Sequence, residues 1–314
     1  FIYNWSTMKQ KYSIIIDCDP GIDDSFALVY GHLSNSFDIK AVFSVAGNVP
    51  IEMTTLNSEF ILSELNLNVP LYRGAEGPLV GEPIIAKYAH GSNGLGGYQF
   101  EPNLKVHANT KNPTDAYYEL LKSFDEPVII AAIGPLTNLA KLFMAYPDVN
   151  QYINAIYVMG GGIVKGNYTA SAEFNIAADP LAAQIVINSG VKQYYVPLDT
   201  TTAYGFNRDF MMKLKDSKHP TSQLLFKIID TKEKLDVNPN AVYYLHDLIT
   251  LIAINHPEWF DFIDVHIAVE LHGVHTTGMT IFDLRGERAQ KPNAIYVAHP
   301  KFSEIQKHVL EVLV

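Results

Sequence analysis

Short β-branched runs alternate along the chain with amphipathic stretches. The first run, Ser13–Ile16, predicts a strand that ends in the turn signal Asp17–Gly21, and a helix is expected over Asp23–His32. A second unit follows, with a strand over Ile39–Val45 and a helix over Ile51–Leu65. Repeated strand–turn–helix units predict an α/β fold with a mostly parallel, open twisted sheet flanked by helices on both faces.

The same alternation continues to the end of the chain. Further strands are expected at Val69–Tyr72, Pro127–Ile133, Ala155–Met159, Gln193–Val196 and Ala294–Val297, with a hairpin from Phe262–Leu271 and Thr276–Leu284. Further helices are expected at Pro113–Phe124, Leu136–Tyr146, Asp179–Ser189, Ser222–Leu235, Asp247–Asn255 and Ser303–Leu313. The stretch Gly74–Asn112 is rich in Gly, Pro, His and Asn, which predicts a long functional loop or lid.

Length and composition fit one soluble domain. An α/β chain of 314 residues is often a single domain, so we expect one domain over residues 13–314. Residues 1–12 are expected to be an extension or the start of the first strand, and Met8 is a candidate native start. With 48% hydrophobic and 18% charged residues, the chain can bury a large core. We find no apolar run of about 18 residues and no secretory pattern, so a cytoplasmic protein without a membrane span is expected.

Charge and cysteine content exclude two further classes. The net charge of −10 argues against a protein that binds the phosphate backbone of nucleic acids. The single cysteine, Cys18, excludes a disulfide framework and the common zinc sites with several cysteines.

Four carboxylates lie within eight residues after the first predicted strand. The segment reads Asp17-Cys18-Asp19-Pro20-Gly21-Ile22-Asp23-Asp24, and no Lys or Arg occurs between Lys11 and Lys40. Such close like charges repel each other, so some would hold a proton unless a cation neutralised them. Carboxylate oxygens suit Ca²⁺ or Mg²⁺, and ligands of open α/β sheets bind at the carboxyl ends of strands. A helix cap would explain Asp23 or Asp24 alone, but not all four carboxylates.

Polar residues also lie at the ends of other predicted strands, at helix starts and in the long loop. The segments are Gly47-Asn48, His90–Gly96, Ile133–Asn138, Asn167, Glu173–Asn175 and His246-Asp247. Each has an ordinary explanation on its own, as a turn residue, a helix cap or a satisfied histidine. The residues alone leave open whether these segments converge on one site.

Taken together, the segments resemble one family. The acidic turn is similar to the D-x-D-P-G-x-D-D signature of the nucleoside hydrolases that prefer inosine or uridine, and the other segments occur in that family's order and approximate spacing from Ile14 to Asp247. The resemblance implies a Rossmann-like nucleoside hydrolase fold in one domain. It also implies hydrolysis of a ribonucleoside to ribose and free base, a role in purine and pyrimidine salvage, and a homodimer or homotetramer.

The resemblance further implies a Ca²⁺ site. Its ligands would be Asp19, Asp24, Asp247 and the backbone carbonyl of Ile133, completed by two ribose hydroxyls and a water. Asp19 would also act as the general base that accepts the proton of that water. A 2′-deoxyribose would lack one of the metal ligands, so a preference for ribose is expected.

The family's substrate contacts map onto further residues. The positions that would hydrogen-bond ribose hydroxyls are Asp23, Asn48, Asn167, Glu173 and Asn175. Met159 would pack against the sugar, His246 would be the general acid for the leaving base, and His90 is a second candidate near the base. Members with histidine at the place of His246 usually accept inosine, uridine or related nucleosides. A nonspecific or pyrimidine-leaning substrate range is therefore expected.

Two other function classes share part of the pattern. A Mg²⁺-dependent phosphatase of the haloacid dehalogenase type also has Asp-x-Asp after its first strand, but normally carries Thr or Val where this chain has Gly21. Release of phosphate from sugar phosphates would favour that class. A non-catalytic nucleoside- or sugar-binding protein would share the ribose contacts without needing a base and an acid. Tight nucleoside binding without turnover would favour it.

Overall fold

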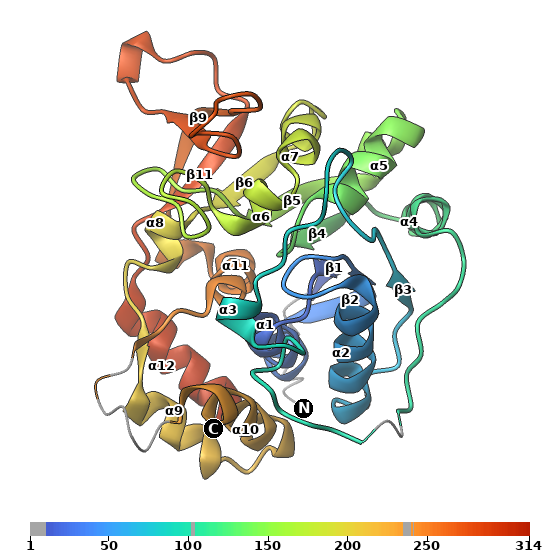
Figure 1. Ribbon diagram of the computed structural model, residues 1–314, viewed down its shortest axis with the longest axis vertical. Helices are drawn as coiled ribbons and strands as arrows, with labels where there is room; N and C mark the ends of the chain where they lie inside the picture. Colours follow the sequence, from blue (N-terminus) through green and yellow to red (C-terminus); the bar gives the residue numbers. More distant parts are fainter. Residues whose placement is uncertain (1–10, 102–103, 235–239, 241) are drawn as a thin grey trace, which may run out of the picture.

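The computed structural model describes residues 11–101, 104–234, 240 and 242–314, shown in Figure 1. Most of the predicted N-terminal extension, including Met8, and Leu235 at the end of one predicted helix lie outside the described residues. Among the described residues, none of the helices is both long and apolar enough to span a bilayer.

The central element is a nine-stranded sheet in the order β10-β9-β11-β6-β5-β4-β1-β2-β3. Its strands are β1 (Tyr12–Cys18), β2 (Phe37–Ser44), β3 (Leu71–Arg73), β4 (Val128–Ala132), β5 (Ile153–Met159), β6 (Gln193–Val196), β9 (Asp261–Val269), β10 (Thr280–Asp283) and β11 (Ala294–Ala298). All pairs from β3 to β11 are parallel, whereas β9 pairs antiparallel with both β11 and β10. The mostly parallel sheet and the predicted hairpin are thus confirmed.

Helices cover both faces of the sheet. One face carries α1 (Ile22–Leu33), α2 (Ile51–Glu64), α9 (Arg208–Lys215), α10 (Pro220–Glu233), α11 (His246–Asn255) and α12 (Phe302–Leu313). The other carries α4 (Pro113–Lys122), α5 (Thr137–Ala145) and α7 (Pro180–Ile187). In Figure 1, α4, α5 and α7 lie above the central strands, and α1, α2 and α11 lie below them.

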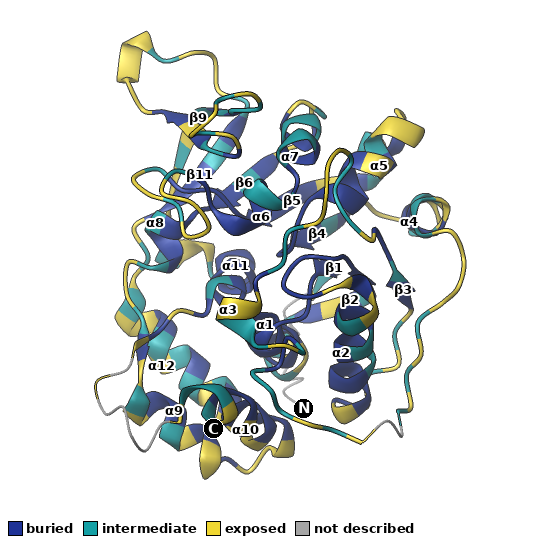
Figure 2. Cartoon of the chain, in the orientation of Figure 1, coloured by how far each residue is buried: buried dark blue, intermediate teal, exposed yellow. Residues whose placement is uncertain are grey.

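The first strand shows why the sequence folds this way. Ile14 and Ile16 belong to the core on the α1 side, and Ile15 belongs to the core on the α5 side. A strand buried on both faces needs a continuous apolar run rather than an alternating one, which is what this segment provides. Figure 2 shows the central strands coloured mostly as buried.

The strand order places a crevice beside β1. From β1 the chain runs outward through β2 and β3, and it then returns to β4 on the opposite side of β1. At such a reversal, the connections after the two neighbouring strands diverge to opposite faces, so ligands bind outside the carboxyl ends of these strands. The acidic turn directly follows β1 and therefore lies at this point.

Several short elements were not predicted. They are α3 (Lys87–His90), α6 (Phe174–Ala178), α8 (Leu198–Thr201), the longer α9, the pair β7 (Phe206–Asn207) and β8 (Val242–Tyr243), and the 3₁₀ turns η1 (Val149–Tyr152), η2 (Pro257–Trp259) and η3 (Gly286–Arg288). Single-turn helices do not span enough residues to reveal a period of about 3.6. α3 interrupts the predicted loop Gly74–Asn112 beside α1 and α11 (Figure 1).

Candidate active site

A cavity of about 420 Å³ opens at the carboxyl ends of the central strands. Every site residue predicted from the sequence lines this cavity except Asp24, which is fully buried behind its wall. The predicted residues in the lining are Asp19, Asp23, Asn48, His90, Ile133, Met159, Asn167, Glu173, Asn175, His246 and Asp247. The structure therefore brings together segments that lie up to 228 residues apart (247 − 19) in the sequence.

The sheet and the first turn of α11 supply much of the rigid part of this lining. Asp19, Asn48 and Ile133 lie just beyond the carboxyl ends of β1, β2 and β4, and Met159 is the last residue of β5. Asp247 lies in the first turn of α11. Because these elements are fixed by the core, their terminal side chains are held at defined positions.

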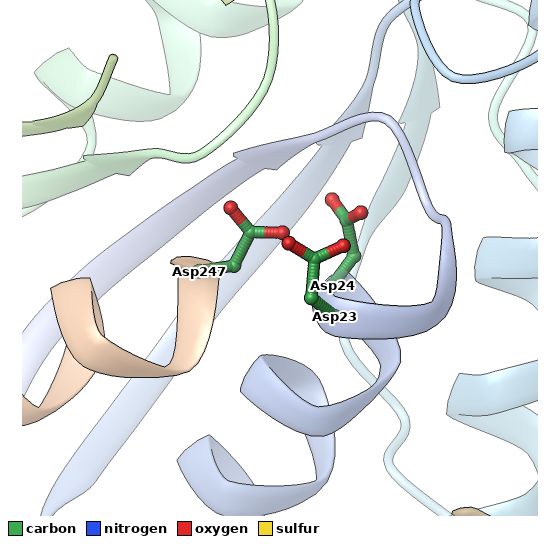
Figure 3. A group of neighbouring side chains, drawn as sticks. All are labelled: Asp23, Asp24 and Asp247. Carbon is green, nitrogen blue, oxygen red and sulfur yellow. The ribbon is translucent and has the colours of Figure 1, made fainter. Parts of the chain in front are cut away.

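Three buried carboxylates converge at the wall of the cavity. Ligand atoms of Asp23, Asp24 and Asp247 all lie within 4.8 Å of one another. Figure 3 shows the carboxylate of Asp247, from α11, pointing toward those of Asp23 and Asp24 in the first turn of α1. Both helices direct the positive ends of their dipoles at the cluster, which partly offsets the negative charge.

The electrostatics of this cluster fit a bound cation. Burial, followed by the charge of Asp23, raises the pKa of Asp24 to about 7. Burial and the charges of Asp23 and Asp24 raise the pKa of Asp247 well above its usual range. The buried Oδ1 of Asp23 has no hydrogen-bond partner, and among the described residues only His90 reaches ion-pair distance of the cluster, 3.9 Å from Asp23. An all-oxygen donor set of this kind suits Ca²⁺ or Mg²⁺.

Asp19 is held beside the cluster by close backbone contacts. Its Oδ2 accepts a hydrogen bond from the backbone N–H of Asn48 at 2.7 Å. Burial, followed by the charge of Asp24, raises the pKa of Asp19. A Cβ atom on Gly47 or on Gly134 would collide with the Asp19 carboxylate, so both positions need glycine for this close approach.

Hydrogen bonds fix the orientation of two side-chain amides. The Nδ2 of Asn48 donates to the carbonyl oxygen of Asp19 at 3.0 Å. The Nδ2 of Asn175 donates to the carbonyl oxygens of Ile133 and Met159 at 3.1 and 3.0 Å. A carbonyl oxygen can only accept, so both amides must direct their NH₂ groups into the protein. The Oδ1 atoms of Asn48 and Asn175 are thereby left as acceptors with no hydrogen bond to the described residues.

In the segment before α6, the side-chain amide of Asn167 accepts a backbone hydrogen bond, whereas the amides of Asn48 and Asn175 donate to the backbone. The Oδ1 of Asn167 accepts from the backbone N–H of Phe174 at 2.8 Å, which leaves its Nδ2 as a donor. Glu173 caps α6 and accepts three backbone N–H groups, including those of Gly161 and Ile176 at 3.0 and 3.1 Å. Burial outweighs these bonds and raises the pKa of Glu173 to about 7. Glu173 therefore holds the shape of the segment while also facing the cavity.

The two histidines of the lining have different partners. The Nδ1 of His90 accepts a hydrogen bond from the backbone N–H of Ile22 at 3.1 Å. The Nδ1 of His246 lies 2.7 Å from the hydroxyl oxygen of Thr201. Burial lowers the pKa of both histidines. A backbone N–H can only donate, so in this arrangement His90 carries its proton on Nε2, whereas a hydroxyl allows His246 to hold a proton on either nitrogen.

Sequence reasoning missed the aromatic part of the lining. Tyr88 and Tyr244 line the cavity and are 62% and 45% exposed, and Phe174 also lines it. Each tyrosine stands two residues before a site histidine, so Tyr88-Ala89-His90 and Tyr244-Leu245-His246 form a repeated Tyr-x-His pattern. That repeat is the one signal in the sequence that points to these aromatic side chains.

Comparison with known proteins agrees with the resemblance seen in the motifs. The model of the inosine-uridine preferring nucleoside hydrolases matches residues 14–304. Proteins named non-specific ribonucleoside hydrolase RihC from Salmonella paratyphi B and Salmonella typhimurium are both 35% identical over 287 residues, covering 91% of this chain and 92% of theirs.

Solved structures show the same fold. A plant nucleoside hydrolase is 26% identical, with a TM-score of 0.88 over 96% of this chain and 98% of its own. An inosine-guanosine nucleoside hydrolase also superposes with a TM-score of 0.88, over 96% of this chain and 98% of its own, at 24% identity. The second likeness concerns the fold alone.

Proposed function

The chain belongs to the inosine-uridine preferring nucleoside hydrolase family and is an N-glycosyl hydrolase of ribonucleosides, and we propose that it works with Ca²⁺ bound at the acidic cluster. We further propose a nonspecific or pyrimidine-leaning substrate range, a role in nucleoside salvage in the cytoplasm, and a homodimer or homotetramer. One observation supports the metal above all others, namely the convergence of three buried carboxylates with no lysine or arginine paired to them among the described residues.

The proposed ligands are Asp19, Asp24, Asp247 and the carbonyl oxygen of Ile133. Asp24 and Asp247 belong to the observed cluster, and Asp19 and Ile133 line the same cavity. The third member of the cluster, Asp23, is proposed to contact a ribose hydroxyl. When bound, Ca²⁺ would supply positive charge that grips two ribose hydroxyls and modestly acidifies a water.

The proposed reaction divides its proton transfers between two residues. Asp19 accepts a proton from water, and the water oxygen forms a bond to the anomeric carbon of ribose. The bond from that carbon to the base nitrogen breaks, its electron pair stays with the base, and His246 gives the base a proton from Nε2. The transition state resembles an oxocarbenium ion, so the negative charges of Glu173 and the aspartates stabilise it.

The fixed amides are proposed to recognise the sugar. The free Oδ1 atoms of Asn48 and Asn175 accept hydrogen bonds from ribose hydroxyls, and the free Nδ2 of Asn167 donates to one. A buried amide that loses its hydroxyl partner is left unpaired, so each missing hydroxyl is costly. We therefore expect ribonucleosides to be cleaved far faster than 2′-deoxyribonucleosides.

The base is proposed to be held by aromatic faces and one fixed donor. His90, with its proton on Nε2, donates a hydrogen bond, while Tyr88 and Tyr244 offer faces on which a base can stack. Stacking tolerates different bases because each has a similar face. A broad range also agrees with the RihC relatives, which are named non-specific ribonucleoside hydrolases.

A panel assay tests the proposed function. The protein is incubated with uridine, cytidine, inosine, adenosine and 2′-deoxyuridine, with added Ca²⁺ or with excess EGTA, and the free base is quantified. We expect release from several ribonucleosides, at least about 100-fold less from 2′-deoxyuridine, and loss of release in EGTA. Full activity in EGTA with no metal detected would remove Ca²⁺ from the proposal. Equal cleavage of the deoxynucleoside would refute the sugar contacts.

A further inference from the structure

We propose that the hydroxyl of Thr201 is a positioning group that holds His246 in the orientation needed to protonate the leaving base. The proposal rests on the role given above to His246 and adds a residue outside the motifs of the sequence. Thr201 is not part of the cavity lining, so it acts through the histidine and not on the substrate.

The geometry is that of a supported histidine. Thr201 is the last residue of the one-turn helix α8, is only 1% exposed, and donates its backbone N–H to the carbonyl of Pro197. Its Oγ1 lies 2.7 Å from Nδ1 of His246, and this is the one hydrogen bond that the hydroxyl makes among the described residues. The Nε2 of His246 makes no hydrogen bond to the described residues and is the nitrogen left for a ligand.

A hydroxyl suits this task because its oxygen can accept a hydrogen bond from Nδ1–H of the ring both before and after proton transfer. When the ring carries both protons, Nδ1–H donates to Oγ1 of Thr201. When the Nε2–H bond breaks and the proton joins the leaving base, the Nδ1–H bond to the same oxygen remains. The ring therefore needs no rotation during the step. The backbone N–H that faces His90 offers no such acceptor, so the same chemistry is denied to that histidine.

The side chain of threonine adds rigidity to this support. Its β-branch restricts rotation about χ1, so the hydroxyl is held toward the ring before substrate binds. The neighbouring Thr200 is equally buried, at 2% exposed, but its hydroxyl donates to the carbonyl of Val297 in β11. Of the two adjacent threonines, Thr201 therefore contacts a residue of the site, whereas Thr200 contacts only the surrounding fold. Thr200 is thus a matched control.

The test compares two leaving groups in several variants. The variants Thr201→Val, Thr201→Ser, Thr200→Val, His246→Ala and the double variant Thr201→Val/His246→Ala are assayed with uridine and with p-nitrophenyl riboside, whose leaving group needs no proton. We expect Thr201→Val to lower kcat for uridine by about 10–100-fold, the loss typical of removing a partner that orients a functional histidine, with KM unchanged. Cleavage of p-nitrophenyl riboside should be preserved.

The remaining variants distinguish a positioning role of the Thr201 hydroxyl from a general loss of folding. Thr201→Ser keeps the hydroxyl and should retain most of the wild-type kcat. Thr200→Val should keep the wild-type ratio of rates for the two substrates. In the His246→Ala background, Thr201→Val should cause no further decrease of kcat for uridine. If Thr201→Val lowers the melting temperature strongly, Thr201→Ala removes the hydroxyl without adding a methyl group, and the same ratio is measured.

Two outcomes overturn the proposal, and they differ from failure of the proposed function. Equal slowing of both substrates by Thr201→Val, or additional slowing of uridine in the His246→Ala background, shows that the hydroxyl does not act through His246. Selective slowing by His246→Ala with no effect of Thr201→Val removes Thr201 and leaves the acid in place. If His246→Ala itself fails to distinguish the substrates, the role of His246 is wrong and the Thr201 proposal falls with it.

Discussion

The two sides of the cavity are built differently. On the side proposed to bind the sugar, Asp19 and Asp24 are almost or fully buried, at 1% and 0% exposed, and the surrounding amides are fixed by hydrogen bonds to backbone carbonyls. On the side proposed to bind the base, Tyr88 and Tyr244 are exposed, and Tyr88 lies in the four-residue helix α3 within a long irregular stretch. Figure 2 shows exposed residues in α3, whereas the central strands are mostly buried.

This difference indicates where selectivity resides. A rigid, desolvated set of polar groups discriminates strongly because each missing partner leaves a buried group unpaired. An exposed aromatic rim gains little free energy from any one contact and adapts to different rings. We therefore interpret the site as strict toward ribose and tolerant toward the base, and the following predictions test that contrast.

The largest effect is expected on the sugar side. Asp19→Ala removes the proposed general base and a proposed metal ligand together, so kcat should fall by at least about 10⁴-fold. Uridine and p-nitrophenyl riboside should be affected alike, because both need an activated water. Asp125→Ala, which changes an exposed carboxylate away from the cavity, is the control. Activity near the wild-type level in Asp19→Ala would refute both roles.

The two histidines should then differ from each other. His246→Ala should slow uridine and inosine by about 10²–10³-fold through loss of the proposed general acid, with a much smaller effect on p-nitrophenyl riboside. His90→Ala removes a donor that is proposed to bind the base, so its effect should lie mainly in KM. The ratio of rates for the two leaving groups is the measurement. A larger change of that ratio in His90→Ala than in His246→Ala would reverse the assignment.

A smaller effect is expected at the aromatic rim. Tyr88→Ala should raise KM by less than about 10-fold, since removing one stacking face costs about 1 kcal/mol, and kcat should change little. Tyr88→Phe keeps the ring and serves as the control. Steady-state kinetics with uridine and inosine would show whether the preference between bases shifts. A loss of kcat as large as that of His246→Ala would show that the rim takes part in the chemistry.

The smallest effect concerns stability without metal. The pKa values of Asp24 and Glu173 are about 7 in the folded protein, above the value of about 4 for such groups in an unfolded chain. Between about pH 4 and 7, the folded state holds protons that the unfolded state releases, so these groups lose their contribution to stability as the pH rises. In EGTA, the melting temperature should therefore fall from pH 5 to pH 7.5.

Three histidines among the described residues oppose this trend, so a variant is needed to isolate the effect of Asp24. Burial lowers the pKa of His32, His90 and His246, which favours folding as the pH rises. The decrease should thus be smaller in Asp24→Asn than in the wild type, and Ca²⁺ should raise the melting temperature more at pH 7.5 than at pH 5. An identical pH dependence in wild type and Asp24→Asn would contradict the shifted pKa of this carboxyl.

The central fold was predictable because its signals are local. The β-branched run Ser13–Ile16 was enough to predict the first strand, and the repeated strand–turn–helix units predicted the mostly parallel sheet. The residues alone left open whether the polar segments after the strands converge, and only their resemblance to a family implied a shared site. Helices α3 and α8 are single turns without a measurable period, so they were not predicted.

The partners of the histidines were not predictable for a different reason. The Nδ1 of His90 meets the backbone of Ile22, which is 68 residues away, and Nδ1 of His246 meets Thr201, which is 45 residues away. Nothing in the residues around either histidine signals its partner, because both contacts arise only when distant elements pack together. These two contacts therefore become visible only in the tertiary structure.

The central claim is that the acidic cluster binds one divalent cation that turnover requires. Its most direct test is a calorimetric titration of the EGTA-stripped protein with CaCl₂, with uridine cleavage measured at each point of the titration. We predict saturable binding of one Ca²⁺ per chain, with turnover rising in proportion to occupancy. Full turnover before Ca²⁺ is added, or no saturable binding, would contradict the claim.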